Sequence, residues 1–95
     1  MNQSKWYVYL IQSQFDSSIY TGITTDVERR LKEHNTSAKG AKYTKTRRPF
    51  ILLASFEAES RSEASKLEYK IKKLTRKQKF KLVETNDISH LKESK

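Results

Sequence analysis

The spacing of apolar residues predicts three short strands. Residues 6–11, Trp-Tyr-Val-Tyr-Leu-Ile, are aromatic and β-branched, as is typical of a strand. Residues 12–18 end in Asp-Ser-Ser and predict a turn, and residues 19–23 predict a second strand. Because the two strands are so close in the chain, we expect an antiparallel hairpin. Residues 51–56 follow the single Pro and predict a third strand.

Three helices are predicted from a shared start signal. A hydroxyl residue is followed three positions later by Glu or Gln, which is the pattern of a capping box. The helices are expected over residues 26–35, 61–74 and 76–84, and the boxes are Thr25 with Glu28, Ser60 with Glu63, and Thr75 with Gln78. The order β-β-α-β-α-α indicates an α+β fold with a small three-stranded antiparallel sheet.

Length and composition narrow the possibilities. A chain of 95 residues forms one domain, with an expected core over about residues 6–84 and a tail over 85–95 whose weak periodicity is typical of a frayed end. The absence of Cys excludes a disulfide scaffold, a thiol nucleophile and a thiolate zinc site. We expect neither a signal peptide nor a transmembrane helix, so the cytoplasm is the default location.

The formal net charge of +9 is concentrated in two segments. Residues 39–50 carry five cations and no anion, and residues 66–81 carry eight cations and one anion. Clustered cations attract phosphates and release their counterions, so nucleic acid is the leading class of partner. The alternative is a basic surface that is only solvated and binds no partner. In the first segment we expect four cations to contact the substrate backbone and one aromatic to stack on a base: Lys42, Lys45, Arg47 and Arg48, with Tyr43.

Two charged residues occupy positions where apolar residues are expected. On a helical wheel Arg30 falls beside the stripe of Val27, Leu31 and His34, whereas Glu33 points away. A buried guanidinium needs an anionic partner or a cleft, unless its stem covers apolar surface and its head reaches water.

Glu68 lies at the edge of the next apolar stripe, among lysines. A single carboxylate in a region that attracts phosphate is a candidate ligand for Mg²⁺, which prefers oxygen donors and keeps its waters. The alternative is an i,i+4 ion pair with Lys72. Two strand tyrosines, Tyr9 and Tyr20, could share one face of the sheet, either as packed aromatics or as catalytic hydroxyls.

In chain order, these residues resemble the signature of the GIY-YIG nuclease family. The matching elements are Tyr7-Val8-Tyr9, Tyr20-Thr21-Gly22, Arg30 with His34, and Glu68, and the resemblance extends over about residues 6–83. Tyr7 stands in place of the first Gly of the family pattern, and Thr21 in place of its middle Ile.

The resemblance implies hydrolysis of a phosphodiester bond with one divalent metal ion, Mg²⁺ or Mn²⁺, held by Glu68. Arg30 would stabilise the negative charge of the transition state. Either Tyr9 or Tyr20 would take a proton from water, and the other would position water or phosphate. His34 would either assist as a proton acceptor or serve only as part of the apolar face of its helix. DNA is the expected substrate, in preference to RNA.

Two other functions are compatible with the same residues. The first is a non-catalytic nucleic-acid-binding module on the same fold, and the second is a protein that binds an acidic partner. The oligomeric state and the structure of the substrate stay open.

Overall fold

A three-stranded antiparallel sheet lies at the centre of the fold. The computed structural model describes residues 5–36, 47–88 and 91, and its strands are β1 (Trp6–Ser13), β2 (Ile19–Thr24) and β3 (Phe50–Ala58). β1 lies in the middle and pairs antiparallel with both neighbours, in the order β2-β1-β3. The predicted hairpin and the α+β class are confirmed, and β3 extends beyond both ends of the predicted strand.

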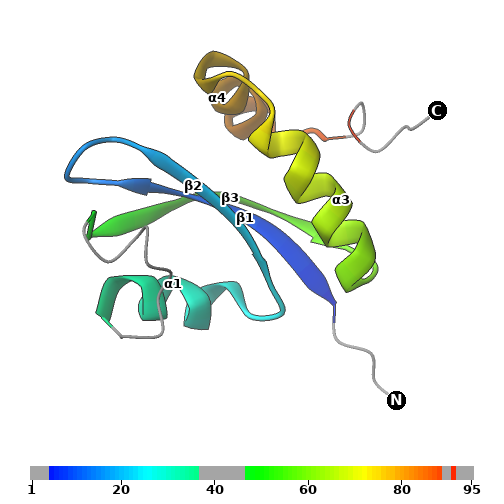
Figure 1. Ribbon diagram of the computed structural model, residues 1–95, viewed down its shortest axis with the longest axis horizontal. Coiled ribbons are helices and arrows are strands. Elements are labelled where there is room, and N and C mark those ends of the chain that lie inside the picture. The colour runs from blue at the N-terminus through cyan, green and yellow to red at the C-terminus, as the bar shows by residue number, and fades with distance from the viewer. Residues whose placement is uncertain (1–4, 37–46, 89–90, 92–95) are drawn as a thin grey trace.

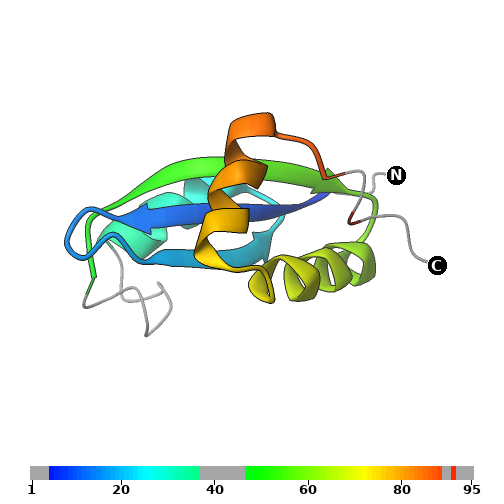
Figure 2. The ribbon, with the colours of Figure 1, turned by 90° about the horizontal axis from the view of Figure 1, so that it is seen from above.

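Three helices cover the two faces of this sheet. They are α1 (Val27–Thr36), α3 (Arg61–Lys72) and α4 (Arg76–Thr85). α1 lies on one side of the sheet, and α3 and α4 lie on the other (Figure 1). Seen from above, α3 runs beside β2, which is an edge strand (Figure 2). No helix in the described part of the chain is both long enough and apolar enough to cross a membrane.

Side-chain caps define where the helices start. The hydroxyls of Ser60 and Thr75 each accept a hydrogen bond from the backbone N–H three residues later, and at Thr75 the reciprocal bond completes the predicted capping box. At α1 the predicted cap was wrong by one residue. Asp26, in place of Thr25, accepts the N–H of Arg29 at 3.1 Å, because a carboxylate both fills this acceptor role and complements the helix dipole.

The alternation of side chains along β1 produces two separate hydrophobic cores. Val8 and Leu10 belong to the larger core, which lies under α3 and α4. Tyr9 and Ile11 point the other way and pack with Phe50 in a smaller core, which the partly buried Val27 and Leu31 of α1 cover. Tyr9 is therefore both a core residue and a candidate site residue.

Candidate active site

The ring of Tyr9 lies across the neighbouring strand at Gly22. The register pairs these two residues directly, so their side-chain positions share one face of the sheet. A Cβ atom on Gly22 would lie 2.5 Å from Tyr9 Oη and 2.7 Å from its Cζ. Real Cβ atoms do not approach so closely, so the ring occupies space that only a glycine leaves open. Sequence reasoning missed this role, although a glycine inside a strand was the available signal.

His34 joins Tyr9 and Tyr20 in an aromatic cluster beneath α1. Its imidazole is fully buried, and its Nε2 lies 2.8 Å from Tyr9 Oη. The ring centroid of Tyr20 lies 5.1 Å from that of His34, in an edge-on arrangement, and 6.3 Å from that of Tyr9. The structure thus brings both candidate tyrosines and the candidate histidine together on the α1 face of the sheet.

Arg30 completes this cluster from the same helix. Its guanidinium hydrogen-bonds to the Tyr9 hydroxyl, and its Nη1 donates to Glu33 Oε1 at 2.8 Å. The expectation that Glu33 points away was wrong. Residues three apart on a helix are neighbours, and the half-buried Glu33 carboxylate reaches sideways to the guanidinium. The anionic partner that Arg30 requires therefore comes from its own helix.

Burial sets the protonation states in this cluster. Burial, reinforced by the positive charge of Arg30, lowers the pKa of His34 to about 4. Burial also raises the pKa of Tyr9 to about 12, and Arg30 opposes that shift only in part. Both groups are consequently neutral at pH 7. Arg30 can only donate, so Tyr9 Oη accepts from the guanidinium. Tyr9 donates its own proton to His34 Nε2 in the imidazole tautomer that carries its proton on Nδ1.

Glu68 approaches the cluster from the other layer of the fold. It lies on α3, and its negative charge raises the pKa of Tyr9, so the carboxylate is within electrostatic range of that hydroxyl. Its side chain is 22% exposed and lies 3.3 Å from Lys72 Nζ. The i,i+4 ion pair considered from the sequence is therefore present. It does not remove Glu68 from the neighbourhood of Tyr9.

Glu68 is the residue that could hold a metal ion here. Within the described ranges, no group of three or more His, Asp or Glu side chains is arranged to bind a metal. A lone, partly exposed carboxylate fits Mg²⁺, which commonly takes one or two protein carboxylates and completes its shell with water and phosphate oxygens. It does not fit a structural zinc site, which needs four protein ligands.

The expected nucleic-acid contacts are only partly visible. Lys42, Tyr43 and Lys45 lie outside the described residues. Arg47 Nε donates to Asp16 Oδ2 at 3.2 Å, in the β1–β2 turn, and Arg48 Nε donates to the His34 carbonyl at 2.6 Å. Both arginines therefore have partners within the protein, and Arg48 binds the C-terminal end of α1, where a cation is favourable.

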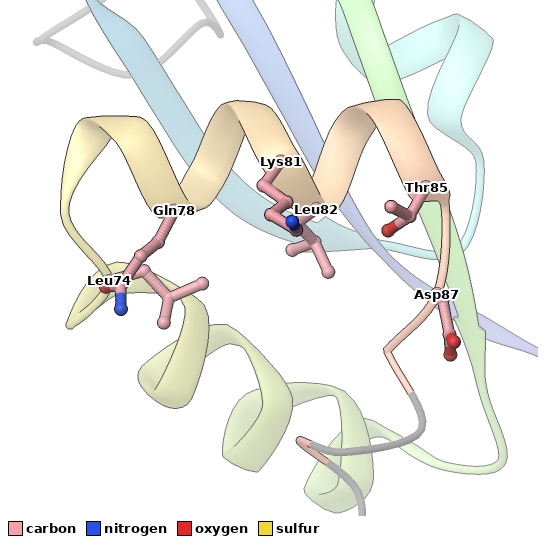
Figure 3. Close-up of a pocket in the computed structure, with 6 residues that line it drawn as sticks. All are labelled: Leu74, Gln78, Lys81, Leu82, Thr85 and Asp87. Atoms are coloured by element: carbon pink, nitrogen blue, oxygen red, sulfur yellow. The ribbon is translucent and has the colours of Figure 1, made fainter.

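A hollow of about 380 Å³ lies apart from this cluster, between α4 and the end of α3 (Figure 3). Residues of α4, of the turn before it and of the segment after it line the hollow: Leu74, Gln78, Lys81, Leu82, Thr85 and Asp87. None of the candidate site residues is among them. The candidate chemistry is therefore at the tyrosine cluster and not in this hollow.

The chain resembles known proteins over most of its length. A family model described as the GIY-YIG catalytic domain matches residues 5–81. A UPF0213 protein of Desulfotalea psychrophila is 50% identical over 82 residues, which is 86% of this chain and 74% of that protein. A UPF0213 protein of Staphylococcus haemolyticus is 51% identical over 81 residues, which is 85% of this chain and 96% of the relative.

Solved structures show the same likeness. A protein of E. faecalis solved by NMR is 47% identical to this chain with a TM-score of 0.61, and the match covers 99% of this chain and 95% of that one. The UPF0213 protein of Bacillus halodurans, also solved by NMR, is 45% identical with a TM-score of 0.55, over 90% and 89% of the two chains.

Proposed function

The chain belongs to the GIY-YIG catalytic-domain family, whose domains are of the nuclease type, and from this we propose that it is a metal-dependent endonuclease that hydrolyses phosphodiester bonds in DNA. The observation that carries the proposal is the meeting of Tyr9, Tyr20, Arg30 and His34 on one sheet face, within electrostatic range of Glu68. The cytoplasmic location and the preference for DNA over RNA are predictions.

In this proposal Arg30 and Glu68 supply the charges. The Arg30 guanidinium faces the negative charge that develops on the phosphate as water attacks. Glu68 holds Mg²⁺ or Mn²⁺, and such an ion, when bound, neutralises charge on the phosphate and on the leaving oxygen. Glu33 keeps Arg30 oriented through its 2.8 Å contact.

We assign the proton transfer to Tyr9 because it has both a donor and an acceptor in place. As Tyr9 Oη takes a proton from water, its own proton passes to His34 Nε2, 2.8 Å away, which accepts it in the tautomer that carries the ring proton on Nδ1. The Arg30 hydrogen bond favours the transient negative charge on that oxygen. Tyr20, which is less buried, is left to position the water or the phosphate.

One observation favours the alternative of a non-catalytic nucleic-acid-binding module. Glu68 is paired with Lys72 at 3.3 Å, and this ion pair competes with a metal ion for the carboxylate. A module that only binds would keep the basic surface but would not cleave nucleic acid. A protein that binds an acidic partner would instead lose nucleic acid to a mildly acidic competitor protein.

A substrate panel with matched variants tests the proposal. Labelled duplex, flap, junction and single-stranded DNA, with RNA counterparts, are incubated with and without Mg²⁺ or Mn²⁺. Glu68→Ala should abolish cleavage yet keep or tighten binding, because it removes an anion from a cationic surface. Arg30→Ala should lose both cleavage and some affinity. Glu84→Ala, the same charge change at an exposed site on α4, is the control.

Two outcomes would count against catalysis at this site. Folded Glu68→Ala protein that cleaves at the parent rate would remove the carboxylate from the site. A parent protein that binds nucleic acid but cleaves nothing in the panel would favour the binding module.

A further inference from the structure

Three cations lie near the turn from α3 to α4. Lys72 lies at the end of α3, Arg76 is the first residue of α4, and Lys79 lies one turn further along. The pKa of Lys79 is lowered because the side chain is partly buried and because the charges of Lys72 and Arg76 act on it. We call these three residues the α3–α4 cation cluster.

Among the described residues, the local structure neutralises this cluster only at Lys72. In the described part of the chain, no carboxylate lies within 4 Å of Arg76 or Lys79, and Lys72 has Glu68. The first turn of α4 carries no acidic residue. Cations at a helix N-terminus oppose the helix dipole, so the arrangement is unfavourable for folding by itself. An anion bound beside these side chains would relieve both the mutual repulsion and the dipole conflict.

The cluster is adjacent to the candidate active site. Lys72 Nζ lies 3.3 Å from Glu68, the proposed metal ligand, and Lys79 is within range of the charge on Lys72. A nucleic-acid backbone carries its phosphates at regular intervals, so a phosphate in the active site brings its neighbours close to these cations.

We propose that the α3–α4 cation cluster binds phosphates of duplex DNA that flank the bond to be cut. The inference rests on the proposed function and adds to it a binding surface outside the cluster of tyrosines, Arg30 and His34. It assigns Lys72, Arg76 and Lys79 to backbone contacts, which set the affinity and the register of the substrate without reading its sequence.

The opposite side of α4 offers a matched control. At 100° per residue, Lys81 lies about 160° around the helix from Lys79, and it lines the hollow between α4 and α3 (Figure 3). Lys81→Gln and Lys79→Gln remove the same charge from the same helix. Only the second removes it from the cluster.

The experiment measures equilibrium binding of a labelled 20-base-pair DNA duplex by fluorescence anisotropy, without divalent metal, across a series of salt concentrations. Lys79→Gln and Arg76→Gln should each lower the salt slope by about 0.9 and weaken binding about fivefold at 0.15 M salt, as expected for one lost phosphate contact. Lys79→Arg should bind like the parent protein, and Lys81→Gln should change the slope much less than the cluster variants. Lys79→Gln should also melt at a higher temperature, since it removes repulsion.

Each result has a defined meaning. Folded cluster variants that bind with the parent slope and affinity overturn this inference and leave the proposed nuclease function standing. A parent protein that binds duplex DNA with the expected variant effects but cleaves none of the panel refutes the proposed function and leaves the binding surface standing. A parent protein that fails to bind the duplex overturns this inference as well.

Discussion

Acidification should destabilise the protein by forcing a proton onto His34. Its pKa is about 4 in the folded chain, against 6.5 for an ordinary histidine, because the ring is buried and lies near the charge of Arg30. The unfolded chain therefore takes up this proton below pH 6.5, whereas the folded chain resists it until about pH 4. The free energy of unfolding therefore has its full value above pH 6.5, where His34 is neutral in both states. It decreases as the pH falls toward 4, because only the unfolded chain gains the proton.

The size of the effect follows from the two pKa values. A change from 6.5 to about 4 corresponds to about 3 kcal/mol in the free energy of unfolding. The imidazole is fully buried, so solvent screening does not reduce this figure. Since a small domain is stable by roughly 5–15 kcal/mol in total, the loss should be easy to measure.

Urea unfolding at pH 7, 6, 5 and 4, followed by the fluorescence of the single Trp, measures the predicted loss. The control is His34→Gln, which keeps every carboxylate, including Asp16, whose pKa is also lowered. Between pH 6.5 and 4 the free energy of unfolding of the parent protein should fall by about 3 kcal/mol more than that of this variant. An NMR titration gives the pKa of His34 directly. The chain has two histidines, so the signal that disappears in His34→Gln belongs to His34 and the one that remains belongs to the other histidine. A folded-state pKa near 6.5, or equal losses in parent and variant, would refute the reasoning.

Three further predictions concern single side chains around the site. Gly22→Ala should destabilise the protein by about 1–3 kcal/mol and shift the Tyr9 ring signals in NMR, because the new methyl group overlaps Oη; unchanged ring signals would contradict this. Thr21→Val should raise the free energy of unfolding by about 1 kcal/mol, measured with urea, because the buried Thr21 hydroxyl has no hydrogen-bond partner among the described residues. Arg48→Ala should raise the pKa of His34 in an NMR titration, since the nearby Arg48 charge helps to lower it; an unmoved pKa would exclude that coupling.

The sequence predicts the elements of this fold well because each carries a local signal. Alternation marks β1, and a side chain that accepts an N–H marks the start of each helix. The wheel also places His34 correctly on the buried face of α1. These features depend only on residues within a few positions of each other.

The details of the site depend on distances that no local pattern contains. The clash of a Gly22 Cβ with Tyr9 follows from strand register and ring orientation together. The Arg30–Glu33 contact depends on how far a flexible side chain reaches around its helix. The bond from Arg48 to the His34 carbonyl joins residues fourteen positions apart, across a chain reversal. Such contacts become visible only when the elements are packed.

The division of the interior into two cores gives the candidate residues unequal freedom to change during evolution. Tyr9 fills the smaller core and hydrogen-bonds to His34, so replacing it lowers stability whether or not catalysis is under selection. Glu68 is only partly buried, and among the described residues its ion-pair partner is the exposed Lys72; an i,i+4 pair of this kind is worth a few tenths of a kcal/mol, so replacing Glu68 costs the fold little. A lineage that kept this fold but abandoned catalysis should therefore lose Glu68 long before Tyr9. Among relatives, a retained tyrosine is weak evidence of activity, whereas a retained carboxylate at this position is strong evidence.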